Sequence, residues 1–107
     1  MNPKFLSYLG LAQRARKLAT GEDIVLKSIR SGSAKLVIIA QDASENTKKK
    51  FYDKCSYFKV PIIETCSRYE LGGSIGKDER VILAIEDAGF AKLVEECFKK
   101  SAEVEEY

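Results

Sequence analysis

Two uninterrupted apolar runs constrain the fold of this chain more than any other feature. Residues 36–40 read LVIIA and residues 81–85 read VILAI, with no polar side chain in either run. A strand with one face in water alternates apolar and polar residues, whereas a continuous run is typical of a strand covered on both faces. We therefore expect helices on both sides of a sheet that contains these two strands.

Segments with the apolar spacing of helices alternate with these strands and with two shorter ones. Proline at a first helical position, Ser-x-x-Glu pairs and glycines after a last turn indicate where helices begin and end. The predicted helices cover residues 3–15, 21–31, 42–58, 67–76 and 87–100, and the predicted strands cover 18–20, 36–40, 60–63 and 81–85. This alternation predicts an α/β fold, a three-layer α/β/α sandwich around a small sheet of about four strands.

The length of 107 residues suits a single domain. We place that domain at residues 1–100 and expect residues 101–107 to form a polar, acidic tail that is frayed because it is too polar to pack. The expected N-caps are Asn2, Thr20 (paired with Asp23), Ser67 (paired with Glu70) and Asp87. The expected core faces are Phe51, Cys55 and Phe58 in the third helix and Phe90, Leu93, Val94, Cys97 and Phe98 in the last.

Composition excludes several classes of protein. The longest apolar run is far shorter than the roughly 20 residues that span a bilayer, and the N-terminal segment lacks the apolar core and small-residue cleavage site of an export signal. We therefore expect a cytoplasmic protein with no membrane partner. An apolar content of 45% is too high for intrinsic disorder.

The residue types that carry most acid–base and metal chemistry are missing or scattered. The chain has no histidine, and its three cysteines, Cys55, Cys66 and Cys97, show no C-x-x-C spacing. The GGSIGK segment at residues 72–77 lacks the spacing, the Ser/Thr and the strand-to-helix context of a phosphate-binding Walker loop. The sequence therefore predicts no enzyme activity, no cofactor, no metal and no small-molecule substrate.

Charge is distributed unevenly although the net charge is only +2. Residues 1–35 hold seven basic side chains against Glu22 and Asp23, whereas residues 93–107 hold five glutamates against two lysines. A basic pole indicates either a polyanionic partner or simply a solvated face. Two groups of cations are candidates for phosphate contact. Arg14 and Lys17 lie within this pole, and the run Lys48, Lys49 and Lys50 lies outside it.

The start of the second helix is the main candidate site. Gly21 and Lys27 enclose Glu22, Asp23 and Ile24 at a helix N-terminus, where unpaired N–H groups and the positive end of the helix dipole favour an anion. One interpretation is a site for RNA phosphates or base edges. The alternative is a structural role, in which the acids complement the dipole and Asp23 pairs with Lys27 at i,i+4.

The turn after the third strand is a second candidate. It contains Thr65, Cys66, Ser67 and Arg68. A cysteine beside an arginine can be a reactive thiol, but no acid–base partner accompanies Cys66. A non-catalytic loop residue is the better interpretation.

These segments together resemble one known family. The spacing of Gly21 and Lys27, the run from Gly32 through the AKLVIIA strand to Asp42, and the later Ser67-x-x-x-Leu-Gly resemble the kink-turn RNA-binding ribosomal proteins, the group of archaeal L7Ae and eukaryotic L30e, and within it the small bacterial YlxQ-like branch. The resemblance covers about residues 4–99. It implies a mixed sheet, no catalysis and binding of structured RNA, including ribosomal RNA.

The resemblance also implies roles for individual residues. The family's Gly-x-Asn-Glu-x-x-Lys motif meets guanine edges, and Gly21 and Lys27 match it. The loop that holds an extruded nucleotide corresponds to residues 65–68. Asp23 stands where the family has Asn, and Ile24 stands where it has Glu. Base selectivity is expected to differ, because an Asp carboxylate cannot donate a hydrogen bond and an Ile side chain can neither donate nor accept one. The rival hypothesis is a ribosome-associated assembly or protein-interaction factor with weak, nonspecific RNA binding.

Overall fold

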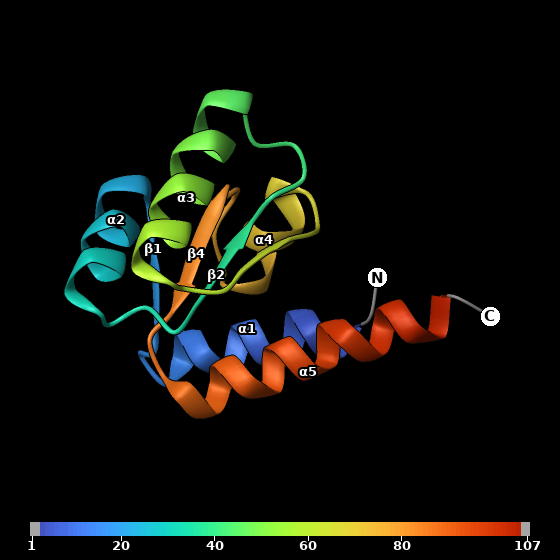
Figure 1. Cartoon of the computed structure of the whole chain (residues 1–107). Helices are drawn as coiled ribbons and strands as arrows, with labels where there is room; N and C mark the ends of the chain where they lie inside the picture. Colours follow the sequence, from blue (N-terminus) through green and yellow to red (C-terminus); the bar gives the residue numbers. More distant parts are fainter. Residues whose placement is uncertain (1–2, 106–107) are drawn as a thin grey trace.

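Helices and strands alternate along the whole chain (Figure 1). The computed structural model describes the backbone of residues 3–105 and the side chains of residues 4–100. The predicted cap Asn2 and residues 106–107 of the predicted tail lie outside this range. The elements are α1 Pro3–Arg14, β1 Leu18–Thr20, α2 Glu22–Ser31, β2 Leu36–Ile39, α3 Glu45–Phe58, β3 Ile62–Glu64, α4 Arg68–Ser74, β4 Ile82–Ile85 and α5 Ala88–Glu105.

The four strands form one mixed sheet in the order β1-β4-β2-β3. Strand β4 is antiparallel to both of its neighbours, and β2 is parallel to β3. Strands β1, β2 and β3 therefore end at the same edge of the sheet at which β4 begins. We call this the upper edge, and we call the opposite one, where β4 ends, the lower edge.

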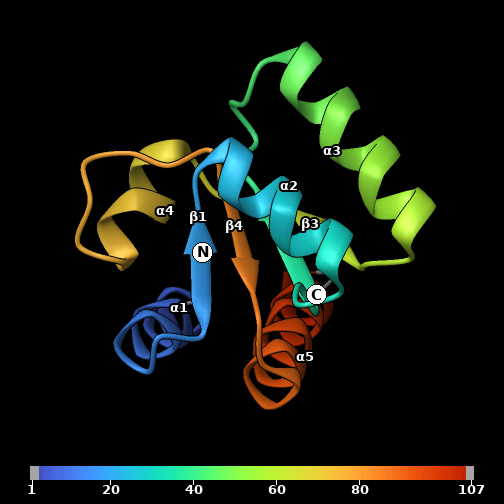
Figure 2. The same cartoon turned by 90° about the vertical axis from the view of Figure 1, so that its left-hand side faces the viewer.

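Helices cover both faces of the sheet (Figure 2). Helices α1, α4 and α5 pack on one face against Leu36, Ile38, Leu83 and Ile85, and α2 and α3 pack on the other against the alternate strand residues. Every residue of β2 and β4 is buried, which explains why their sequences show no alternation. The predicted single-domain, three-layer α/β/α sandwich with a mixed four-stranded sheet is confirmed.

Several predicted caps are confirmed. Ser67 and Glu70 form a complete capping box at the start of α4. The carboxylate of Asp87 accepts a hydrogen bond from the N–H of Phe90 at 2.9 Å, at the start of α5. Helix α2 ends at Gly32, which is left-handed with φ of 83°.

Other predicted helix ends are wrong. Thr20 does not cap α2, because its hydroxyl donates instead to the carbonyl of Ile82 at 3.0 Å, across the sheet. Helix α3 begins later than residue 42, at Glu45, because Ser44 provides the cap. Gly72 and Gly73 lie inside α4 rather than closing it.

One aliphatic and one aromatic side chain that are predicted to be buried are exposed. Leu93 is 46% exposed, because α5 packs along a stripe through Ala91, Val94 and Cys97 and Leu93 falls beside it. Phe58 is 38% exposed, and its ring meets the neighbouring Tyr57 edge-on at 4.9 Å between centroids, at the last turn of α3. The predicted burial of Cys55 and Cys97 is confirmed.

Helix α5 is longer than predicted. Its helical backbone extends to Glu105. None of the helices in the described range is long and apolar enough to cross a membrane.

Close backbone packing fixes the loop that leads into β4. A Cβ on Gly72 would lie 2.5 Å from Cα of Glu79, so α4 and this loop touch backbone to backbone. Only glycine permits that approach. The loop is therefore held against α4 at the upper edge of the sheet.

We expect Gly72→Ala to lower the free energy of unfolding by about 1–3 kcal/mol, because the added methyl must displace backbone. Gly73→Ala is the matched control, since nothing lies within 4 Å of its Cβ position. The control should raise stability by up to about 1 kcal/mol, as alanine does within a helix. Urea denaturation measures both, and equal stability of the two variants would contradict the close packing.

Candidate nucleic-acid interface

The upper edge brings together segments far apart in the sequence (Figure 2). It holds the start of α2, the turn from β2 into α3, the turn from β3 into α4 and the loop before β4. Backbone hydrogen bonds connect the last three of these segments: the N–H of Ala40 donates to Val81 at 2.9 Å and that of Gln41 donates to Cys66 at 2.8 Å. The start of α2 lies beside them because β1, which precedes it, pairs with β4. The two sites predicted from the sequence, at residues 21–27 and 65–68, therefore lie on one edge.

The start of α2 has no side-chain cap. Gly21 occupies the N-cap position with φ of 98°, and Val25 donates the first intrahelical bond to its carbonyl at 2.9 Å. The N–H groups of Glu22, Asp23 and Ile24 have no carbonyl within the helix to bond. Together with the helix dipole they make this end of α2 a favourable place for an anion.

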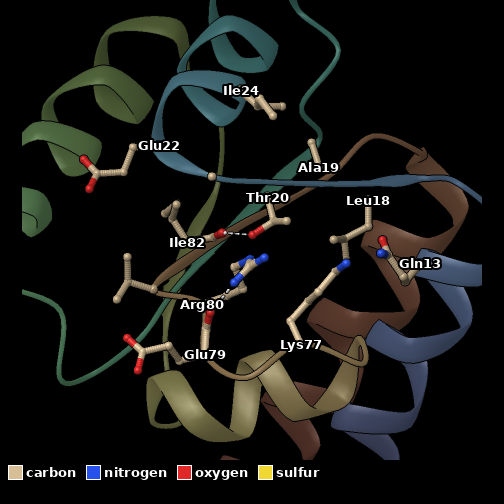
Figure 3. A pocket seen from close by; sticks show the side chains of 12 residues that line it. Gln13, Leu18, Ala19, Thr20, Glu22, Ile24, Lys77, Glu79, Arg80 and Ile82 are labelled. Atoms are coloured by element: carbon tan, nitrogen blue, oxygen red, sulfur yellow. Dashed lines mark hydrogen bonds between the residues drawn. The ribbon is translucent and has the colours of Figure 1, made fainter.

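A cavity of about 770 Å³ opens beside this helix start. Its walls come from the end of α1, from strand β1, from the start of α2, and from the loop before β4 with the start of that strand (Figure 3). Lys77 extends from that loop toward Leu18, and the guanidinium of Arg80 lies beside Thr20. The complete lining is Gln13, Leu18, Ala19, Thr20, Gly21, Glu22, Ile24, Lys77, Glu79, Arg80, Val81 and Ile82.

The exposed side chains of α2 continue this surface. Ile24 is 60% exposed at the cavity wall, and Asp23 and Lys27 are exposed as well. Asp23 and Lys27 form no ion pair among the interactions of the described residues, so the i,i+4 pair considered above is not present. Glu22 instead pairs with Lys50 of α3 at 3.3 Å. Lys27 is thus available to a ligand.

The turn before α4 presents fewer side chains than expected. Thr65 is 5% exposed and Cys66 is 2% exposed, so both point into the protein. Ser67 uses its hydroxyl to accept the N–H of Glu70 at 3.1 Å. Burial raises the pKa of the Cys66 thiol, which keeps it protonated at neutral pH and removes its nucleophilic form.

Arg68 is held by two acids. Its N–H donates to Asp42 Oδ1 at 2.9 Å, and its guanidinium donates to the carbonyl of Asp42 at 2.6 Å. Nη1 also lies 3.6 Å from the carboxylate of Glu79. The N–H of Arg80 donates to the carbonyl of Arg68 at 2.9 Å. This network joins three of the four segments of the upper edge.

Arg14 and Lys17 are not part of this edge. They lie at the end of α1 and just before β1, on the lower edge of the sheet. The strand separates them from Gly21, so the sequence pattern grouped two surfaces that the fold separates.

Gln13, Lys77 and Arg80 are not predicted from the sequence to belong to this edge. The segment from Lys77 to Arg80 reads KDER, a composition that is typical of a solvated turn. Its position before an apolar strand was the available signal, but only the antiparallel placement of that strand brings the segment beside Gly21. The described residues contain no group of three potential metal ligands.

The fold and this edge define an α/β/α domain built around a mixed sheet. A sequence profile of the ribosomal protein L7Ae/L30e/S12e/Gadd45 family matches residues 4–95, and the chain belongs to this family. It is 58% identical over 83 residues to the RNA-binding protein YlxQ of Bacillus subtilis, covering 78% of this chain and 83% of that protein. It is 30% identical over 90 residues to the large ribosomal subunit protein eL8 of Thermoplasma volcanium, covering 83% and 74% of the two chains.

Solved structures give the same fold. A protein of unknown function from Bacillus halodurans superposes with a TM-score of 0.89 at 44% identity, covering 92% of this chain and 99% of that one. The 15.5kD RNA-binding protein of Giardia lamblia superposes with a TM-score of 0.76 over 94% of this chain and 89% of that one, and at 22% identity it supports the fold alone. The predicted family is confirmed by the family profile and by the sequence relatives.

We expect Asp42→Ala to lower the free energy of unfolding by about 1–2 kcal/mol, because an N–H acceptor and a charged partner of Arg68 are lost together. Glu79→Ala removes only the longer, exposed pair and should change stability by less than about 0.5 kcal/mol. Urea denaturation measures both changes. Hydrogen exchange at the Arg68 amide should speed up in the first variant only, and unchanged exchange there would contradict the network's role.

Proposed function

We propose that this chain is a non-catalytic RNA-binding protein of ribosomal type that recognises kink-turn-like structured RNA at the upper edge of its sheet. Its partner class is structured RNA, including ribosomal RNA, and its place of action is the cytoplasm. The family membership supports this proposal, as do relatives named as an RNA-binding protein and as a ribosomal protein.

The single observation that carries the proposal is the juxtaposition of Gly21 with Lys77 and Arg80 around one cavity. Uncapped N–H groups, a guanidinium and an ammonium converge there from two segments 56 to 59 positions apart in the numbering. Phosphate oxygens accept from all three kinds of donor. An open cavity of about 770 Å³ also suits a nucleotide displaced from its stack, the way in which structured RNA is commonly recognised.

Residues of the predicted site take different parts in this proposal. Gly21, Glu22 and Ile24 form the cavity wall at the start of α2. Asp23 is exposed outside that wall, and Lys27 meets phosphates farther along the helix. Arg68 contributes through the loops that it joins. Thr65, Cys66 and Ser67 shape the turn from the interior and offer backbone rather than side chains.

Catalysis is no part of the proposal. The buried Cys66 is protonated, and Cys55, whose pKa burial raises to about 11, is equally unreactive at neutral pH. The acids at the upper edge, Asp42 and Glu79, serve as partners of Arg68.

The decisive experiment is a gel-shift titration with a kink-turn RNA and with a control whose sheared G·A pairs are converted to Watson–Crick pairs. We expect tighter binding of the kink-turn. Lys27→Ala and Arg80→Ala should each weaken that binding about 3- to 10-fold and lower the slope of log affinity against log salt by about 0.7–0.9. Lys99→Ala, at an exposed lysine of α5, is the matched control. Equal affinity for the two RNAs would overturn kink-turn recognition.

A second candidate function is docking of a protein, and the exposure of Ile24 favours it. An apolar side chain on a helix start is poorly suited to base edges but suits an apolar partner surface. RNA-base recognition favours a polar residue at position 24, whereas protein docking favours an apolar one. A substitution at this position therefore distinguishes the two candidate functions.

We expect the double substitution Asp23→Asn and Ile24→Glu, which introduces the residues that the family's RNA-binding motif carries, to increase selectivity for the kink-turn over the control RNA about 10-fold or more. One good bidentate base contact is worth about 1–3 kcal/mol of discrimination. The gel-shift titration above measures the change. If selectivity is unchanged or falls, position 24 serves a surface other than RNA bases, and the protein-docking function gains support.

A further inference from the structure

The lower edge of the sheet brings together three turns, two of which carry basic residues. The turns from α1 into β1, from α2 into β2 and from β4 into α5 lie together there (Figure 1). The N–H of Lys35 donates to the carbonyl of Ile85 at 2.7 Å, and the N–H of Glu86 donates to the carbonyl of Lys17 at 2.7 Å. Lys17 and Lys35 therefore flank the end of β4 on its two sides.

We call this surface the lower basic patch. It consists of exposed cations from both sides of β4: Arg14, Arg16, Lys17, Arg30 and Lys35. Within the part of the chain that the structure describes, no ion pair with an acid involves any of the five. The patch thus keeps its positive charge.

The acids nearest to the patch have other partners. Glu86 accepts a hydrogen bond from the hydroxyl of Ser28 at 2.5 Å, and Ser28 is buried. Asp87 accepts the N–H of Phe90 at the start of α5. Both carboxylates are half-buried, so they reduce the field of the patch without covering it.

Helix ends account for only some of these cations. A basic residue in a last turn complements the negative end of the helix dipole, which explains Arg14 in α1 and Arg30 in α2. The ammonium of Lys35 donates to the carbonyl of Gly32 at 3.0 Å, past the end of α2. Helix ends do not account for Arg16 and Lys17.

Arg16 occupies a backbone position that favours glycine. Its φ is 59°, and it follows α1 in a left-handed turn closed by bonds from Arg16 to Gln13 at 3.0 Å and from Lys17 to Ala12 at 2.9 Å. Glycine fills such positions without strain, as Gly32 does after α2. An arginine there costs stability relative to glycine. Lys59 after α3 shows the same strain, so the argument for a ligand rests on the clustered charge around Arg16 and not on the strain.

We propose that the lower basic patch is a second RNA-contacting surface, which binds the phosphate backbone of a duplex, so that the chain bridges two RNA segments. Guanidinium groups bind phosphate oxygens in bidentate fashion, and duplex RNA is recognised mainly through its backbone and shape. The patch lies at the lower edge of the sheet and the start of α2 lies at the upper edge. The cavity extends between them along β1, from Gly21 to Leu18 and Gln13, so it adjoins the patch at Arg14 and Lys17. The bridging rests on the proposed function of the upper edge, whereas duplex binding by the patch does not.

The first experiment measures binding of a short Watson–Crick RNA duplex to a protein whose upper edge carries Lys27→Ala and Arg80→Ala. Adding Arg16→Gly should weaken the remaining affinity about 3-fold and lower the salt slope by about 0.9. The same substitution should raise the midpoint of thermal unfolding, because it relieves the left-handed strain. A merely structural Arg16 would change stability without changing duplex affinity.

Lys59→Gly is the matched control. Lys59 also follows a helix with a positive φ, 58°, and its turn also lies at the lower edge, but it precedes the outer strand β3, whereas Arg16 precedes the outer strand β1 at the other end of the strand order. It should gain stability in the same way and leave duplex affinity unchanged. Equal losses of affinity in the two glycine variants would overturn the patch as a defined surface.

The second experiment tests bridging. Wild-type protein saturates an immobilised kink-turn RNA, and capture of a labelled duplex is then measured. We expect capture, and we expect the triple variant Arg14→Gln, Arg16→Gly, Lys17→Gln to lose it while it keeps its affinity for the kink-turn. Capture that survives the triple substitution would overturn the proposal. If the kink-turn itself is not recognised, the first experiment still decides whether the patch binds RNA.

Discussion

Strand β4 lies between β1 and β2, antiparallel to both and buried on both faces, and the arrangement of both edges depends on this placement. Each buried Val, Leu or Ile contributes about 1.5–3 kcal/mol relative to an exposed one, so the two central strands are a large part of the driving force for folding. Because β4 runs against its neighbours, its beginning meets the ends of β1 and β2. The loop before β4 is thereby brought beside the start of α2.

The upper edge is stiff because its loops are connected through backbone groups. Arg68 bonds to Asp42 and to Arg80 through main-chain atoms, and Gly72 lets α4 touch the loop at Glu79 without an intervening side chain. Preorganised loops lose little conformational entropy when a ligand binds. A surface of this kind suits an RNA that is itself rigid and bent.

Charge follows the same division into two edges. Lys50 and Arg68 at the upper edge are paired with acids: Lys50 pairs with Glu22, and Arg68 pairs with Asp42 and Glu79. Lys27, Lys77 and Arg80 form no ion pair among the described residues. The cations of the lower basic patch form no such pairs among the described residues. In the proposed function, the upper edge combines unpaired cations with oriented donors, and the lower edge offers net charge, which is the less selective of the two ways to bind RNA.

The sequence by itself determined the layers and most of the elements, because strands without a solvent face require helices on both sides and because capping residues such as Ser67 and Asp87 act locally. It also indicated the start of α2, where Gly21 and Lys27 belong to one short segment. Only the tertiary structure decided that Lys77 and Arg80 share a cavity with Gly21, that Arg14 and Lys17 lie at the other edge, and that Thr65 and Cys66 point inward. Those outcomes depend on the order and direction of strands, which are set by contacts between residues far apart in the chain and leave no local pattern in it.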